Sequence, residues 1–384
     1  MTNSLPKLIA SGHIEARFKV TTPMYLGDAD QLPSTISPNS FKGALRFWWR
    51  AIVWPMLQAQ SDSEPTALKQ LHASEAILFG SAATKYSRRA AVRLTIVQPS
   101  QLRTSGTPVG DGIKYLLCLG LGERRCITPC EFVANFYFNP QSLGTGNLVD
   151  FQTTLLDALR YLGTFGGLGS RARHGFGSVA LQKLLLNGVD QTVADSPLGV
   201  KELLSQFAFT APKPPFTAFS KLSRIDQSAT HRNALQLLNE IGENMQKYRS
   251  WRGDKLFEDD HHLAADIING ERPSLPRRGV FGLPHNYFFS SNRKSLGITV
   301  ADDNRSRRAS PLFIHIHQFP GDDDFVAMQT LLPAVFLPAT ATMQFKPAYA
   351  GNIPHQESKI EWKVIHDYLD RFESRNNLLD GCKS

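Results

Sequence analysis

Cysteine is scarce in this sequence, and long apolar runs are missing from it. The four cysteines form no C-x-x-C pair and have no histidines at ligand spacing, so the sequence predicts neither a zinc site nor a disulfide framework. No stretch of about 18 apolar residues occurs, and the N-terminus lacks a charged region followed by an apolar one. We therefore expect a cytoplasmic protein that does not contact a membrane.

The overall composition is that of an ordinary folded protein, but its basic residues are clustered. The 384 residues are 42% hydrophobic and 20% charged, which suits two domains with sizeable cores. Lysine and arginine exceed aspartate and glutamate by 42 to 34. Clustering, more than this excess, indicates a surface for a polyanion. Lys85, Arg88, Arg89 and Arg93 form a group without acids, and Arg305, Arg307 and Arg308 form a further basic cluster.

Residues 163–177, here called the glycine loop, are the most informative segment. They contain six glycines together with Arg171, Arg173 and His174, and no acidic residue occurs between positions 157 and 190. Glycine allows positive φ and a close approach of the backbone to a ligand. Exposed N–H groups beside permanent positive charge favour a phosphodiester chain. The alternative is a structural turn that binds nothing.

Residues 167–172 formally match the dinucleotide pattern G-x-G-x-x-A. That pattern requires a strand before it and a helix after it. The order here is reversed, because residues 151–165 have helical spacing and residues 176–186 read as a strand. No Gly-Lys-Ser or Gly-Lys-Thr follows, so a Walker loop is excluded as well.

A basic helix is the second informative segment. Ser40 is a reasonable N-cap, and Pro55 predicts an end near Trp54. Four apolar residues share one face of this helix and should be buried: Phe41, Leu45, Trp48 and Ile52.

Lys42, Arg46 and Arg50 form a separate stripe on the same helix. Like charges in this register repel, and no acid lies near them in sequence, so we expect the stripe to face an external anion. The alternative is a solvated helix face. Trp49 borders the stripe and is a candidate for stacking on a base, although contact with the core or with a partner protein is an equal possibility.

The elements predict an α+β fold. Strands at 13–22, 91–98, 113–120, 132–138 and 176–186 surround the two helices in the order β-α-β-β-α-β with one extra strand, a ferredoxin-like pattern shared with RRM-type RNA-binding folds. A doubly wound parallel sheet is the second choice, but it needs helices between the middle strands. We predict an N-terminal domain over 1–190, a linker over 191–215 and a C-terminal domain over 216–384.

The C-terminal domain is harder to interpret. The patterns predict strands at 216–222 and 311–319, helices at 230–248, 258–269 and 359–375, and loops at 272–278 and 293–308. We interpret this domain as a degenerate copy of the N-terminal ferredoxin-like domain, with long insertions.

Several segments together resemble one family. The stretch Ser-Phe-Lys-Gly-Ala-Leu-Arg-Phe-Trp-Trp-Arg, the glycine loop, Arg-Ala-Ser-Pro-Leu from Arg308 and Thr-Pro-Met-Tyr-Leu-Gly-Asp from Thr22 are similar to the first RAMP subunit of the Cmr complex. This complex is the type III-B CRISPR RNA-guided effector. The match is strong over about residues 13–55 and 150–180 and weaker in the second half.

The resemblance implies two tandem ferredoxin-like RAMP domains that hold the 3′ part of the guide (CRISPR) RNA and help engage target RNA in antiviral defence. It implies no catalysis here, since the backbone ribonuclease subunit cleaves RNA. That subunit and the other 3′-end subunit would be partners. The implied RNA contacts are Lys42, Arg46, Arg50, Gly166, Gly167, Gly169, Ser170, Arg171, Arg173 and His174.

Two other functions stay open. One is a metal-independent, guide-processing endoribonuclease that uses His174, or as second choice His13, as general acid or base. The other is a protein-interaction subunit that docks neighbours through Phe47, Trp48 and Trp49. Asp259, His262 and Asp266 fall at helical spacing, but acid-rich helix starts usually compensate the helix dipole, and we expect no metal or cofactor.

Overall fold

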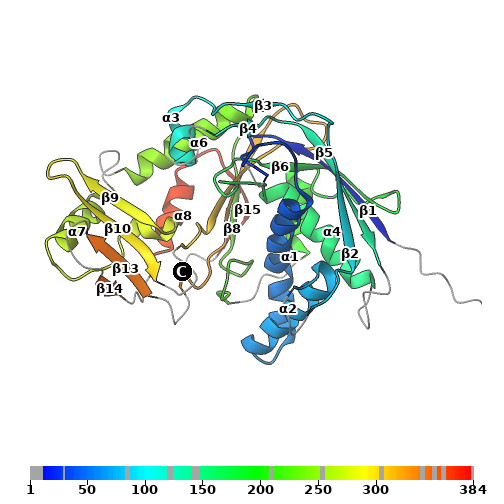
Figure 1. Cartoon of the computed structure of the whole chain (residues 1–384), viewed down its shortest axis with the longest axis horizontal. Helices are drawn as coiled ribbons and strands as arrows, with labels where there is room; N and C mark the ends of the chain where they lie inside the picture. The colour runs from blue at the N-terminus through cyan, green and yellow to red at the C-terminus, as the bar shows by residue number, and fades with distance from the viewer. Residues whose placement is uncertain are drawn as a thin grey trace, which may run out of the picture.

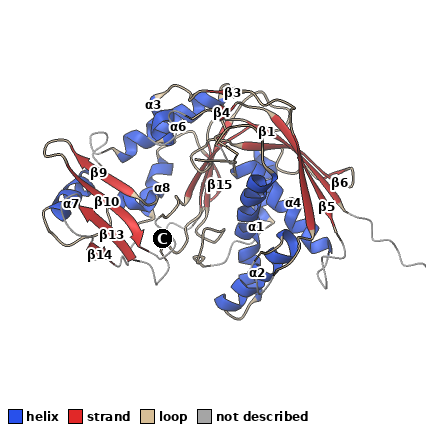
Figure 2. Ribbon diagram, viewed as in Figure 1, coloured by secondary structure: helices blue, strands red, loops and turns tan. Residues whose placement is uncertain are grey.

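Antiparallel sheets with helices packed against them organise the chain (Figures 1 and 2). The described strands form one five-stranded sheet, two four-stranded sheets and a ladder of β3 (Thr104–Ser105) with β4 (Cys126–Ile127). The α+β class is thereby confirmed. The computed structural model describes residues 12–28, 31–82, 87–118, 124–139, 148–206, 212–250, 256–301, 307–337, 342–347, 353–355 and 360–381.

The five-stranded sheet belongs to the N-terminal half and has the order β2-β5-β1-β6-β7. Its strands are antiparallel, and the third strand of the β-α-β-β-α-β pattern, β5, lies between β1 and β2. The predicted strands at 13–22, 91–98, 132–138 and 176–186 are confirmed to within a few residues. The bounds are β1 (His13–Val20), β2 (Val92–Val97), β5 (Glu131–Phe138), β6 (Val179–Leu186) and β7 (Val189–Asp190).

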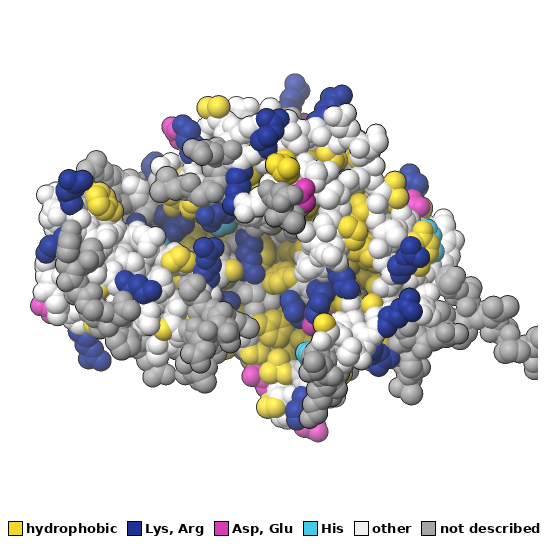
Figure 3. Space-filling view, in the orientation of Figure 1, with side chains coloured by type: hydrophobic (Ala, Val, Ile, Leu, Met, Phe, Trp, Pro, Cys, Tyr) yellow, Lys and Arg dark blue, Asp and Glu magenta, His cyan; other side chains and the backbone are white. Residues whose placement is uncertain are grey.

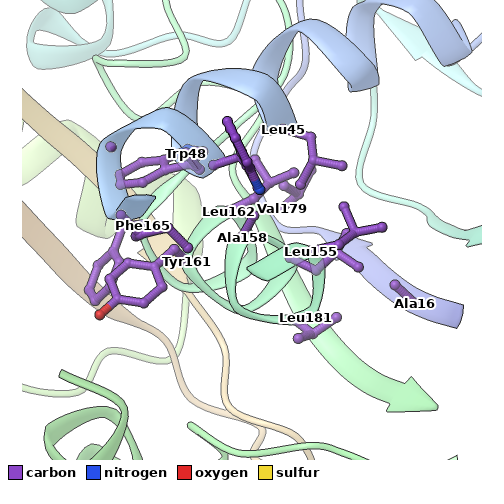
Figure 4. Packing of buried hydrophobic residues seen from close by; sticks show 14 of the residues in the cluster. Ala16, Leu45, Trp48, Leu155, Ala158, Tyr161, Leu162, Phe165, Val179 and Leu181 are labelled. Atoms are coloured by element: carbon purple, nitrogen blue, oxygen red, sulfur yellow. The ribbon is translucent and has the colours of Figure 1, made fainter. Parts of the chain in front are cut away.

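Two helices, α1 (Pro38–Gln60) and α4 (Leu148–Phe165), pack against this sheet and against each other. Figure 4 shows Trp48 of α1 beside Phe165 of α4, with ring centroids 6.1 Å apart. The four residues predicted to form the buried face of the basic helix are at most 2% exposed, which confirms that face.

Helix α1 is longer than predicted at both ends. It begins at Pro38, and Ser37 is its N-cap, because the Ser37 side chain accepts the N–H of Asn39. It also continues through Pro55. A proline leaves the carbonyl four residues earlier without its helical donor. Here the Ala51 carbonyl accepts the N–H of Phe219 at 3.1 Å, so the C-terminal half satisfies the group that Pro55 leaves open.

Two helices in the N-terminal half differ from the predictions. Helix α2 (Glu64–Phe79) was not predicted, although Ser63 caps it. Helix α3 (Asp111–Leu117) replaces the strand predicted at 113–120, because the buried residues there are spaced as on a helix face and pack on α6. These buried residues are Ile113, Leu116 and Leu117.

The second sheet lies in the C-terminal half and has the order β11-β12-β8-β15, all antiparallel. It repeats the order of the first sheet, since its third strand again lies between the first and the second. The helices α6 (Ala234–Arg249) and α8 (Lys363–Asp370) follow its first and third strands. Its strands are β8 (Arg224–Gln227), β11 (Leu312–His317), β12 (Val326–Leu331) and β15 (Asn376–Leu379).

The third sheet is built from two insertions. One lies between α6 and β11 and the other between β12 and α8, and together they pair in the order β14-β13-β10-β9. Figure 1 shows this sheet at the left end of the molecule beside α7 (Glu258–Ile268). The remaining bounds are η3 (Arg277–Phe281), β9 (His285–Phe289), β10 (Lys294–Ala301), β13 (Thr342–Pro347) and β14 (Ile353–His355).

Predictions for the C-terminal half are only partly confirmed. The helices at 230–248 and 258–269 and the strand at 311–319 are present as α6, α7 and β11. The segment 216–222 is not a strand, and α8 covers less than the predicted 359–375. The predicted loops at 272–278 and 293–308 contain the start of η3 and the whole of β10.

The predicted linker at 191–215 is partly helical. Helix α5 (Pro197–Ser205) places Val200, Leu203 and Leu204 in the core of the N-terminal half. The same core includes residues of the C-terminal half, among them Phe219, Ile225, Phe313 and Met328. The two halves therefore share this core, and a second core cluster lies mainly in the C-terminal half.

Replacing Gly112 with alanine should destabilise the protein. A Cβ there would lie 1.9 Å from the backbone oxygen of Asn239 in α6, so the helices would have to separate, at a cost of about 1–3 kcal/mol. Gly43→Ala in α1 is the matched control: nothing lies within 4 Å of its Cβ position, so helix propensity should stabilise by about 1 kcal/mol. Urea denaturation measures both changes, and equal effects would contradict the close packing of α3 on α6.

Candidate nucleic-acid interface

The glycine loop folds back onto the segment that follows β1. The N–H of Ser170 donates to the Tyr25 carbonyl at 2.8 Å, and the N–H of Gly177 donates to the Pro23 carbonyl at 2.9 Å. At Gly169, with φ +86°, a Cβ would lie 2.5 Å from the Tyr25 oxygen. This glycine is therefore required by close backbone packing, and the N–H groups of Ser170 and Gly177 are already paired within the protein.

The other side of the glycine loop pairs with strand β11 of the C-terminal half. The Ile314 N–H donates to the Arg173 carbonyl at 2.9 Å, and the Ile316 N–H donates to Ser178 Oγ at 3.0 Å. His315 Nδ1 donates to the Gly166 carbonyl at 2.5 Å. The loop thus lies between the two halves and is hydrogen-bonded to both.

Arg173 is a link between the halves. Its guanidinium donates to the Ser310 carbonyl and lies over the rings of Phe313 and Phe47, at 4.4 and 5.2 Å. Burial, and secondarily the charge of Arg308, lower its pKa to about 10. The resemblance implies that Arg173 contacts RNA; the structure gives its side chain partners from α1 and from the segment around β11. Its positive charge remains at the junction.

The helix and the loop meet, as the RNA-binding hypothesis requires. A Cβ on Gly166 would lie 2.4 Å from the Trp48 indole nitrogen, and Arg173 reaches Phe47. Phe47 also packs on Phe313, with centroids 5.4 Å apart. Phe47 and Trp48 are therefore engaged inside the molecule, which argues against the hypothesis that they dock neighbouring proteins.

Trp49 lies in the core. It is 1% exposed and its ring meets that of Phe79 edge-on at 5.9 Å. A base cannot reach this ring, so the stacking role considered for Trp49 is wrong and the contact is one of packing.

The basic stripe of α1 has an acidic partner that sequence spacing did not reveal. Glu75 of α2 accepts from Arg46 Nε at 2.7 Å and lies 3.4 Å from Arg50. The Glu75 side chain is 7% exposed, whereas the two arginines are more than one third exposed. Burial and the charge of Arg46 lower the pKa of Lys42. One carboxylate thus serves two arginines, and the stripe keeps a net positive charge.

Three histidines at the junction are neutral at physiological pH. Burial lowers the pKa of His174 to about 3, helped by Arg171, Arg249 and Arg173, and it lowers that of His315 to about 4. Burial likewise lowers the pKa of His317. Because His315 Nδ1 donates to a carbonyl, its Nε2 accepts from His317 Nδ1, 3.2 Å away.

Arginine side chains gather around the glycine loop where the halves meet. Figure 3 shows lysine and arginine side chains around a hollow near the middle of this face. Arg308 lies close enough to Arg173 to lower its pKa. Arg171, Arg173 and Arg249 lie close enough to His174 to lower the pKa of that histidine. In the RNA-binding hypothesis these four arginines and the stripe of Lys42, Arg46 and Arg50 act on one ligand, and we call the whole set the basic cleft. Arg308 belongs to a cluster noted in the sequence, but Arg249 carries no sequence signal of its own.

The open edge of the glycine loop borders a cavity of about 320 Å³. Gly169 and Ser170 line it together with Arg124 and Arg125. Arg125 donates to the Thr104 carbonyl at 3.1 Å. The predicted loop contacts at Gly169 and Ser170 therefore face an accessible space that is lined by two arginines and one acid, Asp28.

Within the described ranges, no group of three or more His, Cys, Asp or Glu residues could hold a metal ion, and no helix is long and apolar enough to cross a membrane. The candidates Asp259, His262 and Asp266 lie on α7. Its buried acid, Asp260, instead accepts the N–H groups of Arg277 and Arg278.

Comparison with known proteins identifies the fold. Residues 17–180 match the family model described as the RAMP superfamily. The crystal structure of Cmr1 from Pyrococcus furiosus (apo form) aligns over 96% of this chain and 99% of that chain, with a TM-score of 0.58 and 17% identity. A chain of the type III-B Cmr-beta complex bound to cognate target RNA aligns over 94% and 99%, with a TM-score of 0.54 and 12% identity. No curated protein matches the sequence significantly.

Acidification should destabilise the folded protein through the histidines of the junction. Because folding lowers the pKa of His315 to about 4, the unfolded chain binds its proton first, so stability is full above pH 6.5 and falls between about pH 6.5 and 4. The loss is about 1.4 kcal/mol per pH unit for each such group. His315→Asn keeps a donor for the Gly166 carbonyl but removes the titrating ring. The free energy of unfolding, measured with urea at each pH, should therefore depend less on pH over this range. The exposed His72→Asn is the control, and identical profiles for wild type and His315→Asn would refute the assignment.

Proposed function

We propose that this protein, a RAMP-superfamily chain with the fold of Cmr1, is the RNA-binding subunit of a type III-B CRISPR effector complex. It would hold the 3′ part of the guide RNA and help engage target RNA. The observation that carries the proposal is the contact between the basic helix and the glycine loop, where Arg173 lies over Phe47. Two arginines of the C-terminal half, Arg249 and Arg308, lie near the same loop. A structurally similar chain belongs to a complex bound to target RNA.

The repeated strand order supports a tandem of two ferredoxin-like units. In each half the third strand pairs between the first and the second, and a helix follows the first and the third strands. The insertions that form the third sheet interrupt only the second unit. The glycine loop is hydrogen-bonded to both units, and this junction is where we propose that the basic cleft binds RNA.

The charges of the cleft suit a phosphate backbone more than a particular base sequence. Arginine side chains can donate two parallel hydrogen bonds to a phosphate, and their charge is permanent. Arg46, Arg50 and Arg171 are each partly exposed. The charge of Arg173 would act on the RNA at short range, while its hydrogen bond to Ser310 holds the halves together.

A guide-processing ribonuclease is the weaker hypothesis. A general acid or base works best with a pKa near the reaction pH, and that of His174 is about 3. We therefore assign cleavage to another subunit of the complex, with which this chain would act in the cytoplasm. Specific cleavage of repeat RNA by the purified chain, lost in His174→Ala, would reverse this assignment.

Glu75→Gln should strengthen RNA binding. Once the Glu75 carboxylate is removed, Arg46 and Arg50 are both available to phosphate. Affinity for single-stranded RNA at low salt should therefore rise severalfold. The slope of log K against log salt should steepen by up to about 0.7. Fluorescence anisotropy over a salt series measures this. Glu64→Gln, an exposed change on the same helix, is the control.

Arg171→Gly provides the opposite arm of this experiment. Arg171 has φ +62°, so glycine removes the charge without straining the backbone. The slope should become shallower by about 0.7, with stability retained. If neither Glu75→Gln nor Arg171→Gly changes the slope, RNA does not occupy the basic cleft.

A further inference from the structure

The outer face of the first sheet carries an unusual row of side chains. Strands β2, β5 and β1 are neighbours, and the register places Arg93 opposite Tyr137 and Tyr137 opposite His13. Helices α1 and α4 pack on the other face of this sheet (Figures 1 and 2). Tyr137 is 44% exposed, and Arg93 is exposed beside it. The basic cleft uses none of these three residues.

The two rings of this row are fixed in a stacked geometry. The His13 and Tyr137 centroids lie 4.7 Å apart with an interplanar angle of 12°. His13 Nε2 bonds Asn135 Oδ1 at 2.9 Å, and the His13 backbone exchanges hydrogen bonds with Asn187. An aromatic surface that is already ordered loses little conformational entropy when a flat ligand stacks on it.

The charge around the ring pair is positive. Within the described part of the chain, no acidic side chain forms an ion pair with Arg93. The nearest acid on this face of β1, Glu15, is held by Arg17 at 2.8 Å. Arg93 also belongs to the acid-free group of the sequence that the cleft leaves unused. A partly exposed ring pair, beside an arginine that has no acidic partner among the described residues, suits a ligand that is both planar and anionic.

We propose that Arg93, Tyr137 and His13 form a second RNA contact, on which an unpaired base stacks while Arg93 binds its phosphate. This rests on the proposed RNA-binding function but concerns another surface. Exposed aromatics on the two central strands of a four-stranded sheet are the general arrangement by which RRM-type sheets stack bases. The sheet here has five strands, and β5 and β1 are the inner two of the four, β2-β5-β1-β6, that form its ferredoxin-like pattern. Polar neighbours of the rings, Thr95 and Asn135, favour a nucleotide over an apolar protein surface.

The test compares oligouridine with an abasic oligomer of the same length, because only the first can stack. Tyr137→Ala in the full chain should weaken oligouridine binding about tenfold and leave binding of the abasic oligomer unchanged. The slope of log K against log salt should stay the same, because no charge is removed. Tyr137→Phe keeps the ring and should restore affinity. Val97→Ala, an exposed change on the same sheet, is the control. Arg93→Gln should make the slope shallower by about 0.7 for both oligomers.

The outcomes separate the two surfaces. If Tyr137→Ala binds oligouridine like the wild type while Arg171→Gly does not, the stacking contact is wrong and the basic cleft stands. If Tyr137→Ala weakens only the association with another subunit of the complex, the face docks protein and the proposal is overturned. If the wild-type chain binds neither oligomer, both the stacking contact and the proposed function fail.

Discussion

Hydrogen bonds between the glycine loop and strand β11 hold the two halves of this protein in one arrangement. Arg173 and Gly166 offer backbone carbonyls to Ile314 and His315, and the Ser178 hydroxyl accepts from Ile316. These groups are buried or nearly so, and an unpaired polar group would be costly there. The glycines allow the backbones to approach closely enough for the bonds to form. The position of the C-terminal half relative to α1 therefore depends on the loop.

This junction also determines where the charge lies. Arg173 stacks on rings from both halves, and Arg308 and Arg249 come close to the loop from the C-terminal side. Burial, and secondarily repulsion by the charge of Arg308, lower the pKa of Arg173. Folding tolerates this repulsion because the histidines stay neutral and the rings face the guanidinium. A bound polyanion would relieve the repulsion among these arginines. The same cluster of arginines therefore accounts for the repulsion and for the proposed binding of RNA.

Local patterns in the sequence predict much of the N-terminal half and less of the rest. The alternation of β1 and the apolar face of α1 can be predicted from the sequence, because each is a regular spacing of apolar residues within a single element. Glu75 as partner of Arg46, Phe219 as donor to Ala51 and the burial of Trp49 depend on elements distant in sequence, which spacing cannot reveal. The same holds for the third sheet, whose strands come from separate insertions. The glycine loop was found by its composition, but its glycines serve packing more than ligand access.

Photocrosslinking tests most directly whether RNA lies where the halves join. Single-stranded RNA carrying 4-thiouridine would be irradiated with the full chain, and mass spectrometry would locate the attached residues. The account predicts crosslinked peptides from α1, from the glycine loop and from the C-terminal half near Arg249 or Arg308. Crosslinks that are absent from α1 and the loop, or confined to the third sheet, would contradict it.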